Sequence, residues 1–203
     1  MTLERGQSWG RTAPLPDDGV IVASDAEAAG VVAAARAAGR AVPVIGLVGG
    51  DLCRTLGGTG DAARLHTSDA VTLPVDIAEV DVDGDTVVFL AHVVARRSWW
   101  RGQVWAAMNA EWLGAWDVAP RAHPGDGLLD TLDVSLGVRD RARARRRVET
   151  GTHVPHPRIE QHRVPAARVE LDAPLDIWVD GRRIGTARAL SVRVTGELVH
   201  CVV

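Results

Sequence analysis

Two turns that combine glycine and aspartate could carry chemistry in this chain. Gly49-Gly50-Asp51 precedes a short helical stretch, and a glycine turn before a helix lets backbone N–H groups approach an anion. The alternative, that these glycines only turn a strand into a helix, stays equally open. Asp180 precedes Gly181, and its carboxylate could act as a general base. Asp-Gly is also a very common two-residue hairpin turn, and we favour that interpretation.

Residues 102–136 are the most distinctive stretch of the sequence. They contain three of the seven tryptophans, and Trp99 and Trp100 come just before them. Tryptophan has the largest apolar side chain, so a cluster this dense usually fills a core or lines a groove. The stretch then passes through PRAHPGDG, where prolines and glycines fix the backbone around one carboxylate, Asp126. The pattern fits either a ligand site or a plain turn with His123 on the surface.

The composition excludes several kinds of chemistry. None of the 203 residues is lysine, so all 23 basic residues are arginine, which rules out an amine nucleophile, a Schiff base and a phosphate-loop lysine. The net charge of −3 argues against a nucleic-acid-binding protein. Cys53 and Cys201 have neither a disulfide framework nor metal-ligand spacing. The sequence has no apolar run of membrane-spanning length and no signal-peptide pattern, so we expect a cytoplasmic protein.

The first third of the chain has the pattern of a small α/β unit. Residues 20–23 and 42–48 are expected to be strands, with a helix between them that starts at Ser24-Asp25. A second, short helix is expected at residues 51–56, directly after the glycine turn. Strand, helix and strand in this order predict a parallel pair.

From about residue 69 onward the pattern changes to strands. They alternate in hydrophobicity, Asp83-Gly84 is a hairpin signal, and one helix is expected at residues 138–148. We therefore predict an α+β protein. Residues 1–68 are expected to form a lead-in and the small α/β part, and residues 69–203 an antiparallel β-sandwich.

Four segments resemble the diacylglycerol kinase family, which includes sphingosine kinases and bacterial lipid kinases. PRAHPGDGLLD is similar to the family's Pro-x-Ala-x-x-x-Asp-Gly-x-Leu-Asp segment, and VGGDLCRTLGG is similar to its Thr-Gly-Asn-Asp-Leu-Ala-Arg-Thr-Leu-Gly segment. WVDGRRIG resembles its Val-Asp-Gly-Glu hairpin, and residues 151–153 resemble its Gly-x-His. Asn109 and Gly114 fall where the family has an Asn and glycines. The resemblance implies the C-terminal β-sandwich of a lipid kinase, preceded by a remnant of the nucleotide-binding domain.

The family reaction is the ATP-dependent phosphorylation of a lipid hydroxyl, and the chain departs from the family pattern in two places. Leu52 stands where the Gly-Gly-Asp-Gly-Thr nucleotide segment needs glycine, and the resemblance implies that the N-terminal stretch that carries that segment has no counterpart in these 203 residues. This argues against ATP binding. Arg182 replaces the Glu of the Asp-Gly-Glu hairpin, which leaves Asp180 as the catalytic candidate.

The resemblance also implies a structural Mg²⁺ ion. In the family, the Asp-Gly turn binds this ion through the Asp side chain and nearby backbone carbonyls. The corresponding ligands here are Asp126 and the carbonyls of His123 and Leu128, a set of hard oxygen donors.

Residues 138–148, VRDRARARRRV, carry six arginines. Such a run usually marks a solvated helix face. In a relative of lipid kinases it could instead dock on anionic lipid headgroups, through Arg139, Arg143, Arg146 and Arg147.

Three functions follow as hypotheses. The first is a protein that is not catalytic by itself and that binds a lipid or anion, or regulates or complements a full-length kinase partner. The second is an active lipid or small-molecule kinase whose nucleotide site is completed in a homodimer. The third is a protein-interaction module built on the tryptophan cluster. The expected contacts are a lipid or anionic small molecule and, peripherally, the inner face of the membrane.

Overall fold

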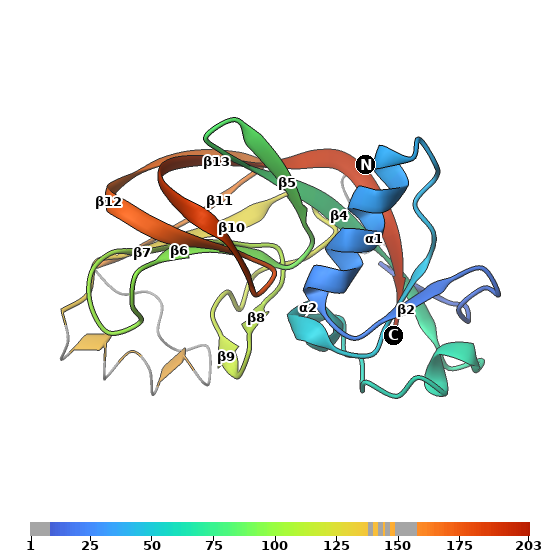
Figure 1. The fold of residues 1–203 in the computed structure, drawn as a ribbon. Helices are drawn as coiled ribbons and strands as arrows, with labels where there is room; N and C mark the ends of the chain where they lie inside the picture. The colour runs from blue at the N-terminus through green and yellow to red at the C-terminus, as the bar shows by residue number, and fades with distance from the viewer. Residues whose placement is uncertain (1–8, 138–139, 142–143, 145–146, 149–157) are drawn as a thin grey trace.

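The computed structural model describes residues 9–137, 140–141, 144, 147–148 and 158–203. The chain begins with short strands and two helices and continues almost entirely as strands (Figure 1). In chain order the elements are β1 Arg11–Thr12, β2 Val20–Val22, α1 Asp25–Ala37, β3 Ile45–Leu47, α2 Gly50–Thr55, η1 Arg64–His66, β4 Val71–Val82, β5 Asp85–Phe89, β6 His92–Arg96, β7 Val104–Met108, β8 Trp112–Leu113, β9 Trp116–Asp117, β10 Leu129–Val134, β11 Ile159–Val164, β12 Ala166–Val179 and β13 Arg182–Val202.

The N-terminal α/β unit has the predicted form. Strands β2 and β3 are parallel, with Val20 opposite Ile45, and helix α1 connects them. Ser24 is the N-cap of α1, and its hydroxyl accepts a hydrogen bond from the N–H of Glu27 at 3.3 Å. Side-chain capping satisfies one of the N–H groups that a helix start leaves without an intrahelical partner.

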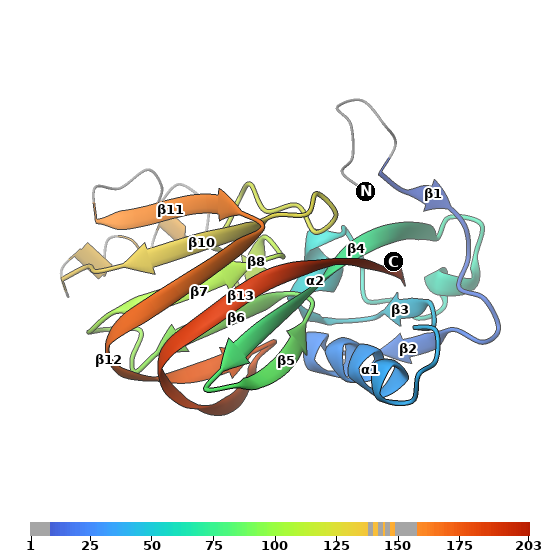
Figure 2. The ribbon, with the colours of Figure 1, turned by 90° about the horizontal axis from the view of Figure 1, so that it is seen from above.

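Apart from β8 and β9, which form a separate two-stranded hairpin, the remaining strands form an antiparallel sheet that folds over itself. Along the sheet the order is β1-β4-β13-β12-β6-β7-β10-β11, and β5, like β1, pairs with β4 on the side opposite β13. Irregular pairing within β12 and within β13 interrupts these two long strands, and such irregularities increase the local bend and twist of a sheet. The layers of β4, β5, β12 and β13 and of β6 and β7 enclose a buried apolar cluster that includes Phe89, Trp105 and Ile177 (Figures 1 and 2). The predicted α+β class with a β-sandwich is confirmed.

Strand β13 belongs to both parts of the molecule. Its first half pairs with β12, and its last residues run parallel to β3, with Cys201 opposite Ile45 (Figure 2). Strand β1 also pairs with β4 across the predicted division near residue 68. The two parts therefore share one hydrogen-bonded sheet. Whether residues 1–68 and 69–203 behave as separate domains stays a prediction.

The Asp-Gly turns at Asp83 and at Asp180 are tight hairpins. Asp83 and Gly84 have φ of 55° and 93°, and Asp180 and Gly181 have φ of 47° and 81°. Positive φ at both central residues is the type I′ geometry, whose twist matches that of the flanking strands. The hairpin interpretation of both turns is therefore correct.

The predicted helix at residues 138–148 is described only in part. Asp140, Arg141, Ala144, Arg147 and Val148 are helical. Among the described residues, no helix is long and apolar enough to cross a membrane.

The shared strand predicts a single unfolding transition. Ile45 is fully buried on β3, so Ile45→Ala should lower the free energy of unfolding by about 2–5 kcal/mol. Six of the seven tryptophans lie between residues 99 and 178, so their fluorescence reports on the sandwich. In urea, fluorescence and far-UV circular dichroism should shift together in this variant.

Ile21→Ala is the matched control. Ile21 lies on the neighbouring strand β2 but is 43% exposed, so its truncation should change stability by only about 0.5 kcal/mol or less. A shift of the circular dichroism transition without the fluorescence transition in Ile45→Ala would mean that the α/β unit unfolds independently.

Candidate functional site

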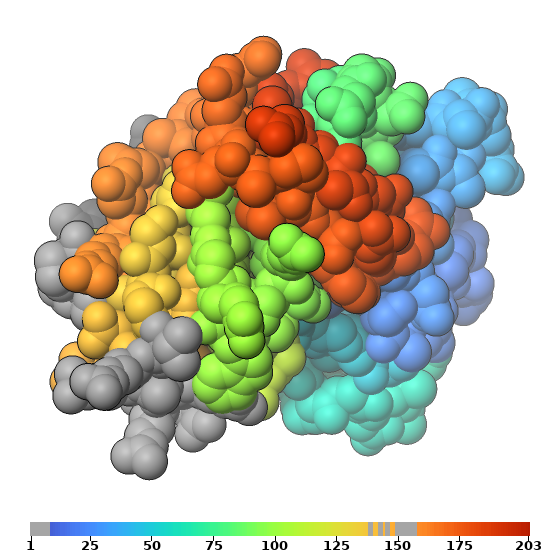
Figure 3. Space-filling view, turned by 60° about the vertical axis from the view of Figure 1, so that its left-hand side comes forward, coloured from blue at the N-terminus to red at the C-terminus, as the bar shows by residue number. Residues whose placement is uncertain are grey.

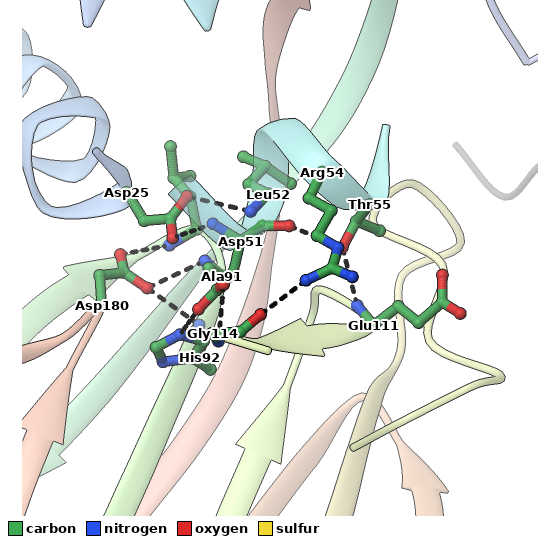
Figure 4. Close-up of polar contacts among 11 residues, drawn as sticks. Asp25, Asp51, Leu52, Arg54, Thr55, Ala91, His92, Glu111, Gly114 and Asp180 are labelled. Carbon is green, nitrogen blue, oxygen red and sulfur yellow. Dashed lines mark hydrogen bonds and ion pairs between the residues drawn. The ribbon is translucent and has the colours of Figure 1, made fainter. Parts of the chain in front are cut away.

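A cluster of ionisable side chains is buried where the α/β unit meets the sandwich (Figure 4). We call it the junction cluster; its members are Asp25, Asp51, His92 and Asp180. Asp25 and Asp51 come from the starts of α1 and α2, His92 from the start of β6, and Asp180 from the β12–β13 turn. Residues far apart in sequence meet here because β12 and β13 return the chain to β6 and to the α/β unit.

The carboxylate of Asp25 caps the start of α2. Its Oδ2 accepts a hydrogen bond from the N–H of Asp51 at 2.7 Å, and its Oδ1 accepts one from Leu52 at 3.0 Å. Gly50 has φ of 93°, and a β-carbon at this position would collide with the Asp25 carboxylate. The glycine turn therefore allows an internal anion to approach the helix start. Anion binding at Gly49, Gly50 and Asp51 stays a prediction that requires Asp25 to move.

Asp51 links α2 to two elements of the sandwich. Its Oδ2 lies 2.9 Å from Nε2 of His92, and its Oδ1 accepts a hydrogen bond from the N–H of Gly114 at 2.8 Å. Arg54, one turn further along α2, lies over the ring of Trp112 at 3.5 Å and donates to the carbonyl of Gly114 at 2.9 Å. These contacts fix the β8–β9 hairpin on α2 (Figure 4).

Asp180, the catalytic candidate, is only 6% exposed. Its carboxylate accepts hydrogen bonds from the N–H groups of Leu90, Ala91 and His92 at 2.9–3.0 Å. These donors hold the turn against the start of β6. A carboxylate in this position stabilises the β5–β6 connection, and a base role for it stays a prediction.

Burial raises the pKa of both Asp25 and Asp180. For Asp25 the pKa rises to about 6, because desolvation and the charge of Asp180 outweigh the N–H donors and His92. Desolvation also raises the pKa of Asp180, against the opposing charge of His92 and its N–H donors. Burial by itself would lower the pKa of His92, but the hydrogen bond to Asp51 and the neighbouring carboxylates raise it. At all three groups the folded protein therefore binds a proton more tightly than the unfolded chain does.

The junction cluster also contains the described residues that could hold a metal ion. One ligand atom from each of Asp25, Asp51 and His92 lies within 4.8 Å of the others. All four carboxylate oxygens of Asp25 and Asp51 already have hydrogen-bond partners. The carboxylates of Asp25 and Asp51 are therefore satisfied by hydrogen bonds from the protein itself.

The groups at the Asp126 turn do not fit a magnesium site as they are arranged. Oδ2 of Asp126 forms an ion pair with Nη2 of Arg163, and Oδ1 accepts a hydrogen bond from the N–H of Leu128 at 3.0 Å. The carbonyl of His123 accepts from Gly125 at 2.8 Å and from Asp126 at 3.3 Å. The positive charge beside Asp126 is therefore a guanidinium. Magnesium at this turn stays a prediction that requires Arg163 to move.

Four of the seven tryptophans surround or adjoin an apolar pocket on the sandwich. Trp99, Trp100 and Trp116 line it, and its volume is about 120 Å³. The rest of the wall consists of side chains of β7, β8, β10 and β11, of Val118 and Leu136 just after β9 and β10, and of helical Arg141, Ala144 and Val148. Trp105 lies on β7 between two pocket-lining residues and points to the opposite side, into the sandwich core. Both expected roles of the cluster, filling a core and lining a groove, are therefore present.

The described arginines of the 138–148 segment differ in position. Arg147 is exposed, as the prediction of a solvated or lipid-facing helix requires. Arg141 is only 6% exposed, and its guanidinium donates to backbone carbonyls, including that of Leu136 at 2.9 Å. Arg139, Arg143 and Arg146 lie outside the described residues.

Sequence reasoning missed two members of the junction cluster. Asp25 was interpreted together with Ser24 as a helix cap, whereas its side chain caps the other helix. His92 was not singled out, although a histidine inside the apolar strand AHVVA suggests a buried partner. Asn109, which the resemblance did mark, is fully buried and donates to the carbonyls of Asp76 at 3.1 Å and Leu90 at 2.8 Å.

Comparison with known proteins identifies the class of fold. Residues 70–202 match the sequence profile of the YegS C-terminal NAD kinase beta sandwich-like domain. The match spans more than half of the chain, and the protein belongs to this family. A search of curated protein sequences finds no match.

Three solved structures from Bacillus anthracis strain Sterne share this fold. One, provisionally named a diacylglycerol kinase, has a TM-score of 0.66 at 15% identity and aligns over 91% of this chain and 77% of that chain. A second, named a diacylglycerol kinase, has a TM-score of 0.59 at 15% identity over 91% and 75%. A third, again provisionally named, has a TM-score of 0.61 at 16% identity over 91% and 77%. The predicted resemblance is confirmed for the fold.

The junction cluster predicts that stability falls as pH rises. Because the pKa of Asp25 is raised from 3.8 to about 6, the folded state holds a proton that the unfolded state has released. Between these pH values the fold should lose about 3 kcal/mol of stability, and the loss should persist above pH 6. The raised pKa values of Asp180 and His92 act in the same direction.

Urea unfolding at a series of pH values measures this effect. Asp25→Asn should flatten the slope between pH 4 and 6, whereas Asp17→Asn, at an exposed carboxylate, should keep it. An unchanged slope in Asp25→Asn would contradict the assignment. The slope is compared, and not the absolute stability, because an asparagine has only one side-chain oxygen to accept the two N–H groups.

The Asp126 turn predicts a magnesium response only when its arginine is removed. In Arg163→Gln, millimolar Mg²⁺ should raise the free energy of unfolding by about 1.4 kcal/mol at ten times the dissociation constant. Wild type should not respond. Arg193→Gln removes an ion pair with Glu79 on another surface and should also not respond. Equal stabilisation of wild type and Arg163→Gln would show that Arg163 does not take the place of the ion.

Proposed function

We propose that this protein binds the apolar tail of a lipid in the tryptophan-lined pocket and does not transfer phosphate by itself. The proposal joins two sets of observations. One is the pocket on the sandwich, and the other is the arrangement of the charged groups in the junction cluster.

The pocket is the observation that carries the proposal. Thirteen of its fourteen lining residues among the described part of the chain are apolar, and the exception, Arg141, has its guanidinium turned to backbone carbonyls. Its volume of about 120 Å³ is close to the roughly 150 Å³ of an apolar cavity that accommodates benzene. Ligand pockets are typically concave and mostly apolar. A segment of an acyl or prenyl chain matches these walls, and a polar metabolite does not.

The junction cluster supports the non-catalytic part of the proposal. Phosphoryl transfer depends on positioned donors and cations around the transferred group. Here the two N–H groups at the start of α2 already donate to Asp25, and three N–H groups already donate to Asp180. Neither set is available to a nucleotide or a lipid hydroxyl without rearrangement, and the proposal therefore assigns no ATP to this chain alone.

Two other functions remain as alternatives. A kinase whose site is completed by a second copy or by a full-length partner would need Asp25 and Asp180 to be released on assembly. A protein-interaction module would place a partner's side chain in the pocket. Both differ from the first proposal in the response to a free lipid.

Binding of a fluorescent dansyl-labelled fatty acid tests the proposal. Wild type should bind the probe saturably below its micelle concentration, and unlabelled fatty acid or monoacylglycerol should displace it. Ala106 and Ala144 both line the pocket, from β7 and from the helical segment. Ala106→Phe and Ala144→Phe should each weaken binding about tenfold or more, because a tenfold loss corresponds to about 1.4 kcal/mol.

Ala34→Phe, the same substitution at an exposed position of α1, is the control and should bind as wild type does. Equal probe binding by folded Ala106→Phe, Ala144→Phe and wild type would exclude the pocket. Incubation of the lipids with Mg·ATP should yield no phosphorylated product, and transfer of phosphate would favour the kinase alternative.

A further inference from the structure

The loop between β6 and β7 is held in a defined shape by Arg141. The guanidinium donates to the carbonyl of Trp99 at 3.1 Å and to that of Gly102. It also donates to the carbonyl of Leu136, two residues after the end of β10, at 2.9 Å. The two clamped carbonyls lie on either side of Trp100 and Arg101, so these two residues form the apex of a fixed turn.

Aromatic and cationic contacts fix the base of the same loop. Arg96 lies 4.5 Å from the ring centre of Trp99 and 4.7 Å from that of Trp178. Trp99 also packs edge-on against Trp116 on β9, with ring centres 5.1 Å apart. Cation–π and T-shaped aromatic contacts of this kind contribute about 0.5–1.5 kcal/mol each. They hold Trp99 as the inner wall of the pocket.

Trp100 projects from this fixed loop towards solvent. It is 48% exposed, and the only other large apolar side chain exposed to a similar degree in the described part of the chain is Ile21. Trp100 also lines the pocket, so it stands at the pocket mouth. Arg97 and Arg101, on either side of it in sequence, are both exposed. The loop lies at the end of the sandwich far from α1 (Figure 1).

We propose that Arg97, Trp100 and Arg101 form a docking loop for an anionic lipid bilayer. Trp100 enters the interface between headgroups and acyl chains, and the two arginines contact lipid phosphates. Resting on the proposed lipid-tail function, this places the pocket mouth on the membrane, so that a tail passes into the pocket without crossing water. Figure 3 shows this side of the molecule, where the green β6–β7 region lies beside the yellow region of β10.

The combination of side chains suits the interface of an anionic membrane. An indole prefers the membrane interface because its ring is apolar and its N–H is polar. Each arginine close to an anionic leaflet contributes about 1 kcal/mol, and salt screens that attraction. The chain as a whole has a net charge of −3, so attraction to an anionic bilayer must come from a local group of cations such as this one.

Flotation with lipid vesicles tests the docking loop. Wild type should float with vesicles of phosphatidylcholine containing 30% phosphatidylglycerol, a composition chosen for its anionic charge. It should float poorly with phosphatidylcholine alone, or with the anionic vesicles at 0.5 M salt. Trp100→Ala should reduce the bound fraction several-fold and Trp100→Phe should keep most of it. The double variant Arg97→Gln/Arg101→Gln should lose the preference for anionic vesicles.

The matched controls remove side chains of the same kind at exposed positions outside the docking loop. Ile21→Ala removes the other exposed apolar side chain, and Arg40→Gln/Arg188→Gln removes two exposed arginines elsewhere on the surface. Both should float as wild type does. Flotation of Trp100→Ala and of the loop arginine variant equal to that of wild type would overturn the proposal. So would the absence of flotation by wild type.

The pocket variants separate this proposal from the one on which it rests. Ala106→Phe and Ala144→Phe leave the three loop side chains in place, so they should keep vesicle flotation while they lose the fatty-acid probe. Probe binding by wild type without flotation would refute the docking-loop proposal and leave the proposed pocket function intact. Flotation without probe binding would support the loop as a membrane contact and refute the proposed lipid-tail function of the pocket.

Discussion

The pairing of the last strand with both parts of the molecule is the constraint on which the structure depends. Strand β13 starts at the Asp180 turn, crosses the sandwich beside β12 and β4, and ends in parallel with β3. Its first end fixes Asp180 against β6. Its last residues, including Cys201, pack into the core of the α/β unit. The junction cluster exists because one strand ties these distant segments together, and its buried charges are held by the surrounding backbone.

Several charged groups with limited exposure in this protein have partners from within the chain. The Asp25 carboxylate accepts hydrogen bonds from N–H groups at the start of α2, and the Asp180 carboxylate accepts them from N–H groups at the start of β6. Asp126 forms an ion pair with Arg163. Arg141 is satisfied by backbone carbonyls. A buried charge is costly without such partners, because desolvation removes the stabilisation that water provides. These internal partners occupy the groups of the junction cluster, and the proposed function therefore places the ligand in the apolar pocket.

The same principle links the pocket and the loop beside it. Arg141 closes one wall of the pocket and at the same time fixes the loop that carries Trp100. A tryptophan held half-exposed on a fixed backbone costs little conformational entropy on docking, since the loop is already ordered. The proposed tail pocket and the proposed membrane contact are therefore parts of one structural unit, and the junction cluster is a separate one.

By itself the sequence determined the local features of this protein. Strand and helix patterns, the Ser24 cap and the Asp-Gly hairpins depend on neighbouring residues, and the PRAHPGDG segment identified the family fold. Only the tertiary structure decided what the charged residues contact. Asp25 was expected to start one helix and caps another, and Asp126 was expected to bind magnesium and is paired with Arg163. The physical reason is that these partners lie 26 or more residues apart in sequence, and only packing of the completed sheet brings them within hydrogen-bonding distance.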